Sequence, residues 1–346
     1  MGLSHPFLSK NYASHSQMKL LQPIHQVGIC GIGQMGAAAA VCFKRAGYRV
    51  FLWARNPKKL DSVGRTLQTL ETWMDLNVGP AAHPGETIRR LESLQTLDEK
   101  ADLVMDCIAE DMEQKTQLLR QFPHCKARGA IFITTTSGLS ITEMGRLSGC
   151  SHQLAGTHFW NPPHLMPLVE VVRGEDTPDR VIEQVCQFVK SLGKIPVKVQ
   201  RDVPGFIGNR LLHALWREAI YLVERGIATP EDVDLVARFT FGLRMPAIGP
   251  LENMDLVGLD LVERIHQYLL ADLADNHGPS EYLTKSTREG RLGVKSGEGF
   301  YDWGSRNAEQ VIQKRDMQIV HQLSFLKELE NNRQDGKAEP AERKGR

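Results

Sequence analysis

A glycine-rich turn between a short apolar strand and a helix constrains the fold of this chain more than any other feature. The strand is expected at residues 27–30, and the turn that follows reads Gly31-Ile32-Gly33-Gln34-Met35-Gly36. In such a turn the first glycine permits the tight bend, the second lets backbone approach a pyrophosphate, and the third lets helix and strand pack closely. An alanine-rich helix and a strand at 48–53 follow. The sequence therefore predicts a dinucleotide site with the pyrophosphate at the helix N-terminus.

Short β-branched segments alternate with helical stretches up to about residue 200. The further strands are expected at residues 102–108, 130–135, 154–158, 168–172 and 195–199, and residues 58–95 are expected to be a helical excursion. This alternation is typical of an α/β fold, with a mostly parallel sheet and helices on both faces. From residue 203 the apolar residues follow the helical period instead.

These patterns predict the domain organisation. Residues 1–22 are expected to be a disordered lead-in, and residues 23–202 a dinucleotide-binding domain. Residues 203–303 are expected to form an all-helical C-terminal domain, and residues 304–346 a helix followed by a disordered charged tail.

The bulk composition limits the partners that the chain can have. A formal net charge of +1 over 346 residues gives no reason to expect nucleic acid or an anionic membrane as a partner. No apolar run approaches the ~20 residues that a membrane span needs, and the start lacks the apolar core of a secretory signal. Scattered cysteines without CxxC spacing predict neither disulfides nor a metal site, and they favour a reducing, cytoplasmic compartment. The cysteines are Cys30, Cys42, Cys107, Cys125, Cys150 and Cys186.

A histidine and a glutamate on neighbouring expected strands form the first candidate catalytic pair. His158 ends the strand at 154–158, and Glu170 lies in the strand at 168–172. A carboxylate beside an imidazole fixes its tautomer and stabilises the imidazolium, which a general base removing an alcohol proton requires. Ligands of open α/β sheets bind at the carboxyl ends of strands, where His158 is expected.

Three further segments accompany this pair in chain order, and they read TTTSGLSIT at 134–142, PGFIGNR at 204–210 and KSGEGFY at 295–301. Together with the turn at 31–36, HFWNP at 158–162 and LVEVV at 168–172, they make the chain resemble the L-3-hydroxyacyl-CoA dehydrogenase family over roughly residues 24–303. The resemblance implies a Rossmann-type domain and a helical domain through which the protein forms a homodimer. It also implies hydride transfer between a 3-hydroxyacyl substrate and NAD.

The resemblance also implies a role for individual residues. His158 matches the family's catalytic base and Glu170 its partner. Ser137 matches the hydroxyl that binds the substrate 3-oxygen, and Asn209 the amide that completes that polar pocket. The residues that line the nicotinamide side match Glu110, Lys115, Asn161 and Lys295.

The end of the second strand departs from the family pattern. Ala54 stands where the family has an Asp that binds the ribose 2′-hydroxyl, and Arg55 follows it. Loss of the carboxylate removes a repulsion against a 2′-phosphate, and an arginine can pair with that phosphate bidentately. This favours NADP or use of both cofactors, whereas an Arg55 that only stacks on adenine would leave NAD as the cofactor.

A second departure concerns the substrate. The residues at 69–77, where the family holds coenzyme A, include no Lys or Arg. One reading is an acyl-CoA substrate whose phosphates meet Arg65, Arg89 or Arg90. Another is a dehydrogenase of a free 3-hydroxy acid, such as a sugar acid or a carnitine-like compound. A third is a non-catalytic, dinucleotide-binding structural protein, against which the intact catalytic set counts.

Overall fold

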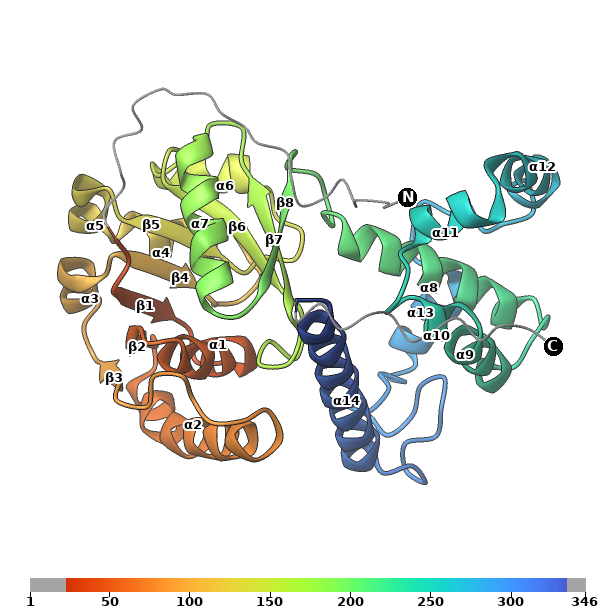
Figure 1. Ribbon diagram of the computed structural model, residues 1–346, viewed down its shortest axis with the longest axis horizontal. Helices are drawn as coiled ribbons and strands as arrows, with labels where there is room; N and C mark the ends of the chain where they lie inside the picture. The colour runs from red at the N-terminus through yellow and green to blue at the C-terminus, as the bar shows by residue number, and fades with distance from the viewer. Residues whose placement is uncertain (1–22, 335–346) are drawn as a thin grey trace. The chain divides into compact units, whose positions relative to one another are not determined.

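The computed structural model describes residues 23–334, and the chain divides into two compact units (Figure 1). Of the described residues, the sheet unit takes 23–71, 81–160 and 167–202. The helical unit takes residues 72–80, 161–166 and 203–334. The predictions for residues 1–22 and for the end of the charged tail lie outside the described residues.

The sheet unit contains one eight-stranded sheet with the order β3-β2-β1-β4-β5-β6-β7-β8. All neighbouring strands are parallel except β6 and β7, which are antiparallel. The strands are β1 Gln26–Cys30, β2 Arg49–Trp53, β3 Ile88–Leu91, β4 Leu103–Asp106, β5 Ile131–Thr134, β6 Leu154–Phe159, β7 Leu168–Arg173 and β8 Ile195–Val199. This architecture confirms the predicted mostly parallel α/β fold. The helical excursion expected at residues 58–95, with an interruption at Gly79-Pro80, is only partly correct, because β3 lies within that range and adds an edge strand beside β2.

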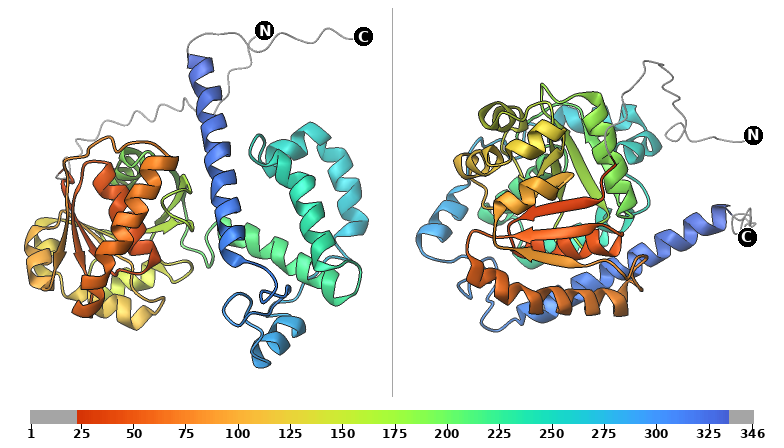
Figure 2. Two further views of the ribbon diagram at one scale, coloured as in Figure 1. Left: turned by 90° about the horizontal axis from the view of Figure 1, so that it is seen from below. Right: turned by 90° about the vertical axis from the view of Figure 1, so that its left-hand side faces the viewer.

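Helices lie on both faces of this sheet (Figure 2). They are α1 Gln34–Arg45, α2 Pro57–Asn77, α3 Leu94–Lys100, α4 Met112–Arg120, α5 Pro123–Arg128, α6 Ile141–Ser148 and α7 Asp179–Ser191. The central strands are buried almost without interruption, as expected for parallel strands covered on both faces. Four alanines of α1, residues 37–40, are also buried and let this helix pack closely on the sheet.

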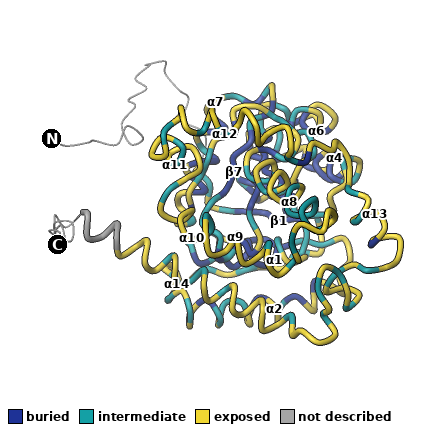
Figure 3. The backbone as a smooth tube through the Cα atoms, turned by 90° about the vertical axis from the view of Figure 1, so that its right-hand side faces the viewer, coloured by how far each residue is buried: buried dark blue, intermediate teal, exposed yellow. Residues whose placement is uncertain are grey.

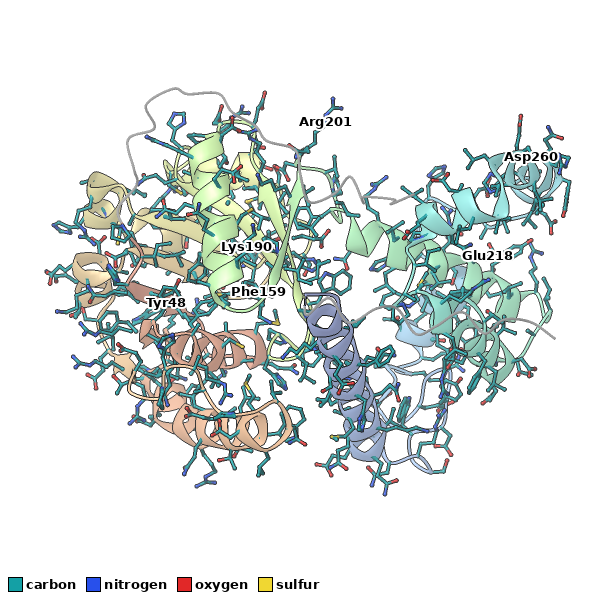
Figure 4. All side chains as sticks on the ribbon, viewed as in Figure 1. Tyr48, Phe159, Lys190, Arg201, Glu218 and Asp260 are labelled. Atoms are coloured by element: carbon teal, nitrogen blue, oxygen red, sulfur yellow. The ribbon has the colours of Figure 1, made fainter. Side chains whose placement is uncertain are left out.

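Aromatic side chains join α1 to the rest of the core. The ring centroid of Phe43 lies 6.3 Å from that of Phe159, which Figure 4 labels, and 5.1 Å from that of Phe188 on α7. Tyr48, also labelled, lies 5.0 Å from Phe188 and precedes β2. This cluster fixes the helix that follows the glycine turn relative to the carboxyl end of β6.

The helical unit consists mainly of α8 Gly208–Glu224, α9 Pro230–Phe239, α10 Phe241–Arg244, α11 Pro250–Val257, α12 Leu259–Leu269, α13 Glu281–Arg288 and α14 Ala308–Gln334. Local sequence explains where several begin. Thr229 caps α9 by accepting a hydrogen bond from Asp232 N, with Pro230 in the first turn, and Ser280 caps α13 in the same way. Within the unit, Glu218 on α8, labelled in Figure 4, accepts a hydrogen bond from Ala274 N at 2.8 Å.

Residues of α8 to α12 are unusually exposed. None of the residues in these five helices, all of which the structure describes, is buried. Figure 3 accordingly draws α9 to α12 mostly in the colours of intermediate and exposed residues. Among the described residues, no helix combines the length and apolar character needed to cross a membrane.

Candidate active site

The glycine turn has the geometry that its sequence predicts. Gly31 has a φ of +116°, and a Cβ there would lie 2.5 Å from the Cys107 carbonyl oxygen. A Cβ on Gly36 would lie 2.0 Å from the Gly31 carbonyl oxygen. Both positions therefore exclude any side chain, for conformational reasons at Gly31 and for steric reasons at both. The Gly31 N–H donates to the Trp53 carbonyl at 2.9 Å and ties the turn to the end of β2.

Gly33 differs from the other two glycines of the turn. It is the N-cap of α1, without a side-chain cap, and an added Cβ would meet no protein atom within 4 Å. The first turn of α1 carries no acidic residue. Unpaired N–H groups and the helix dipole favour an anion at such a position. The open space and the chemistry fit a dinucleotide pyrophosphate.

The end of β2 is basic. Arg55, Lys58 and Lys59 are exposed, and the first turn of α2 has no acidic residue. Asn56 Oδ1 accepts a hydrogen bond from Lys58 N at 3.0 Å, which helps to start this helix. A negatively charged cofactor group at this strand end would therefore meet positive charge without a nearby carboxylate in the same segment.

His158 and Glu170 contact each other directly. They are register partners in the antiparallel pair β6–β7, so their side chains lie on the same face of the sheet. His158 Nδ1 lies 2.7 Å from Glu170 Oε2, and the two side chains are 7% and 2% exposed. A neutral imidazole that donates its Nδ1–H to this carboxylate keeps Nε2 as an acceptor. The pair can thus take a proton at Nε2 and stabilise the resulting charge.

Trp160 packs beside this pair, and sequence reasoning assigned it no role. Its ring centroid lies 5.1 Å from that of His158. The indole therefore restricts the orientation of the imidazole and limits its contact with water. The aromatic residue two positions after the histidine was the only sequence signal for this contact.

Ser137, Glu110 and Lys115 are brought together at the ends of β4 and β5. Glu110 Oε1 accepts hydrogen bonds from Ser137 N at 2.7 Å and from Thr136 Oγ1 at 2.6 Å. Lys115 Nζ lies 3.8 Å from Glu110 Oε2 and 2.9 Å from Asp106 Oδ2. Asp106 and Thr136 were missed at the sequence level. An acidic residue ending an apolar strand was the available signal for Asp106.

The remaining predicted site residues belong to the helical unit. Asn161 directly follows Trp160, and Asn209 is the second residue of α8, just after the buried Phe206. Lys295 lies in a turn in which Ser296 Oγ accepts a hydrogen bond from Leu292 N at 2.7 Å. The sheet unit alone therefore contains the glycine turn, Arg55, His158, Glu170, Ser137, Glu110 and Lys115.

Two family models match the chain in tandem. Residues 26–203 match the model described as "3-hydroxyacyl-CoA dehydrogenase, NAD binding domain", and residues 205–303 match "3-hydroxyacyl-CoA dehydrogenase, C-terminal domain". The chain belongs to the 3-hydroxyacyl-CoA dehydrogenase family. This confirms the predicted family and, with it, the prediction that the protein is an NAD-dependent oxidoreductase.

Individual members of the family differ in their substrates. A probable 3-hydroxybutyryl-CoA dehydrogenase of Bacillus subtilis is 34% identical over 289 residues, which is 82% of this chain and 99% of the relative. An L-carnitine dehydrogenase of Nocardiopsis dassonvillei is 31% identical over 339 residues, 94% of this chain and 96% of the relative. A solved structure described as 5-formyl-3-hydroxy-2-methylpyridine 4-carboxylic acid 5-dehydrogenase, an NAD⁺-dependent dismutase, is also similar, with a TM-score of 0.83 at 30% identity. The match covers 88% of this chain and 99% of that chain.

Proposed function

We propose that this chain oxidises the secondary alcohol of a 3-hydroxyacyl compound, reversibly, with His158 as the general base and acid. The contact between His158 and Glu170, buried at 2.7 Å near the carboxyl end of β6, carries this proposal. In oxidation, Nε2 of His158 accepts the hydroxyl proton, and Glu170 stabilises the imidazolium that forms. Bound nicotinamide supplies the hydride acceptor. In reduction, His158 returns the proton to the 3-oxygen.

Ser137 and Asn209 are proposed to hold the 3-oxygen. A hydroxyl and an amide can both donate to a carbonyl oxygen, and such donors act most strongly where charge develops during the reaction. The glycine turn, with Gln34 and Met35 at the start of α1, is proposed to hold the pyrophosphate. Glu110, Lys115, Asn161 and Lys295 are proposed to line the nicotinamide side.

We propose that NADPH is accepted as well as NADH. Arg55, with Lys58 and Lys59 close to it in sequence, offers positive charge at the end of β2, where Ala54 provides no carboxylate for a ribose 2′-hydroxyl. A guanidinium can bind a 2′-phosphate through two parallel hydrogen bonds. This basic segment supports binding of a phosphorylated ribose.

The substrate could be one of two chemical kinds, a coenzyme A thioester or a free 3-hydroxy acid. Membership of the family favours a coenzyme A thioester, with exposed Arg65, Arg89 or Arg90 for its phosphates. A free 3-hydroxy acid is favoured by the absence of Lys and Arg from residues 69–77 and by two similar proteins whose names give substrates that are not coenzyme A esters, L-carnitine among them. The second half of α2 exposes apolar Leu76 instead. On these grounds we propose the free 3-hydroxy acid as the first candidate substrate and the acyl-CoA as the second.

One assay separates these candidates. NADH or NADPH oxidation is followed at 340 nm with acetoacetyl-CoA and with free acetoacetate at matched concentrations. Faster reduction of the free acid supports the first candidate. Faster reduction of the thioester, with a KM that rises with ionic strength because exposed arginines are screened, supports the second. No turnover of these two substrates, nor of L-carnitine or a 3-hydroxy sugar acid, by a protein that binds NADH would instead indicate the non-catalytic reading.

We also propose that the protein is a homodimer through its helical unit and that it acts in the cytoplasm. The unit's helices expose large apolar side chains, which a single chain rarely leaves in water. They include Leu211, Trp216, Leu235, Val236, Phe239, Leu243, Leu251, Leu256 and Leu259. Symmetric pairing is the commonest way to cover such a surface. Six free thiols support a reducing compartment.

A further inference from the structure

A buried carboxylate, Asp106, lies behind the Ser137 turn and has no part in the chemistry proposed above. It ends β4, and neither its side chain nor that of Lys115 is exposed. Asp106 Oδ2 accepts hydrogen bonds from Lys115 Nζ at 2.9 Å and from Thr134 Oγ1 at 2.8 Å, and Oδ1 accepts one from Ile108 N at 3.1 Å. A buried ion pair needs such additional hydrogen bonds to offset the cost of desolvation. This carboxylate is therefore held rigidly.

The ammonium of Lys115 connects Asp106 to a second carboxylate. Its Nζ lies 3.8 Å from Glu110 Oε2, and the Glu110 side chain is 46% exposed. Because the Glu110 side chain is this exposed, packing against its neighbours does not fix its orientation. The orientation of Glu110 therefore depends on the Lys115 charge and on the groups that donate to its other oxygen.

Those donors belong to the turn that presents Ser137. Thr136 Oγ1 and Ser137 N donate to Glu110 Oε1 at 2.6 and 2.7 Å, and Thr136 Oγ1 also accepts a hydrogen bond from Leu139 N at 2.9 Å. A continuous series of contacts thus runs from Asp106 through Lys115 and Glu110 to the Ser137 backbone.

We infer that Asp106 is a positioning residue, which orients Glu110 through Lys115 and thereby sets the backbone of the Ser137 turn. The inference rests on the proposed function, in which the Ser137 hydroxyl meets the substrate. Without the negative charge of Asp106, Glu110 is the one carboxylate partner that residues 23–334 offer the Lys115 ammonium. Coulomb attraction in a buried site then draws Glu110 toward Lys115 and away from its two donors on the turn.

The amide proton of Ser137 reports this change directly. In ¹H–¹⁵N spectra of the full-length, deuterated protein, Glu110→Gln is expected to move this signal upfield, because a neutral oxygen accepts the hydrogen bond more weakly. Asp106→Asn is expected to move it in the same direction by a smaller amount. The double variant is expected to match Glu110→Gln alone, because the effect of Asp106 passes through Glu110.

Kinetics give the second readout, in the keto-acid assay described above. A displaced turn is expected to raise the KM for the keto substrate by about tenfold in Asp106→Asn, with a smaller change in kcat. In the Glu110→Gln background the same substitution is expected to leave KM unchanged. If the wild-type enzyme turns over none of the substrates named for that assay, the proposed function fails, and the amide signal still decides the positioning role.

Asp98→Asn is the matched control. Asp98 is a buried aspartate of the same unit that accepts hydrogen bonds from His124 N and Cys125 N, so its loss costs stability in a comparable way. It is expected to lower the melting temperature and to leave the Ser137 signal and KM unchanged. If Asp106→Asn does not fold, Asp106→Asn/Lys115→Met removes both charges together, which proteins often tolerate. No ammonium then draws Glu110 from the turn, so the Ser137 signal is expected to stay near its wild-type position, and a large upfield shift in this variant would contradict the inference.

Three further results would overturn the inference. One is an unchanged Ser137 signal in Asp106→Asn. Another is an equal shift in Asp98→Asn, which would indicate a general loss of rigidity. The third is an effect of Asp106→Asn on KM that is undiminished in the Glu110→Gln background.

Discussion

At the scale of single residues, the contact between His158 and Glu170 follows from strand geometry alone. Partners in an antiparallel register lie on one face of the sheet, so two residues twelve apart in sequence meet. His158→Gln should lower kcat by about 10²–10⁴-fold, which is the usual contribution of a positioned acid–base group. NADH affinity, measured by fluorescence titration, should stay within about twofold of the wild-type value. A loss of turnover below tenfold would contradict the assignment of His158 as the base.

Arg55 makes the cofactor preference testable. Arg55→Ala should weaken NADPH binding by about 10–100-fold, because a charge-assisted contact is worth ~1.5–3 kcal/mol. NADH binding should change much less, since NADH has no 2′-phosphate. Both dissociation constants are measured by calorimetry, with Lys100→Ala on α3 as a control for loss of a surface charge. An equal loss for the two cofactors would mean that Arg55 only stacks on adenine.

At the scale of elements, two glycines of the turn between β1 and α1 serve different purposes: Gly36 is needed for folding, and Gly33 is expected to be needed for cofactor binding. Gly33→Ala adds a methyl group where no protein atom lies within 4 Å, so the melting temperature should hardly change. The methyl would occupy space that the pyrophosphate needs, and NADH affinity should fall at least ~10-fold. Gly36→Ala places its methyl 2.0 Å from a carbonyl oxygen, so this variant should lose stability as well. Similar melting temperatures for the two variants would contradict this distinction.

A tyrosine in the segment before α14 links alkaline stability to one hydrogen bond. Tyr301 Oη donates to Asp234 Oδ2 on α9 at 2.7 Å, and burial together with this carboxylate raises the pKa of Tyr301 to about 12. The unfolded chain loses this proton near pH 10, so between about pH 10 and 12 it binds fewer protons than the folded chain. Stability therefore falls as pH rises through this window. Urea titrations at pH 8.5 and 11 should show a smaller alkaline loss for Tyr301→Phe than for wild type.

The elements also differ in how far sequence could predict them. Strands β1, β4 and β5 are buried, and their runs of apolar residues made them predictable from the sequence. Strand β3 was missed because its centre is Arg89-Arg90, and an edge strand can expose such charges. The glycine turn was predictable because local spacing specifies it. The His158–Glu170 contact was predictable because both residues lie on strands expected to be neighbours and within motifs of one family, whereas their spacing alone does not specify it. The network around Asp106 was not, because it depends on where β4, α4 and the Ser137 turn meet in three dimensions.

At the scale of the whole molecule, the exposed apolar face of the helical unit predicts how the chain associates. Light scattering coupled to size exclusion should give twice the chain mass. Phe239→Glu places a charge on α9, where the ring is 60% exposed, and should shift the protein toward monomer. Leu147→Glu adds the same charge to an exposed leucine of α6 in the sheet unit and should leave the mass unchanged. A monomeric wild-type protein at micromolar concentration would contradict the proposal.

The two units are interleaved along the chain, and this restricts how the family can be recombined. The boundary is crossed after residues 71, 80, 160, 166 and 202, so the helical unit draws on short segments embedded in the sheet unit's sequence. In a chimera joined to a relative at residue 202 alone, the helical unit would contain segments from both proteins, because residues 72–80 and 161–166 would still come from this chain. Grafting must therefore carry residues 72–80 and 161–166 along with the C-terminal helices. Because residues 161–166 lie between His158 and Glu170, every such graft changes the segment that connects the two members of the proposed catalytic pair.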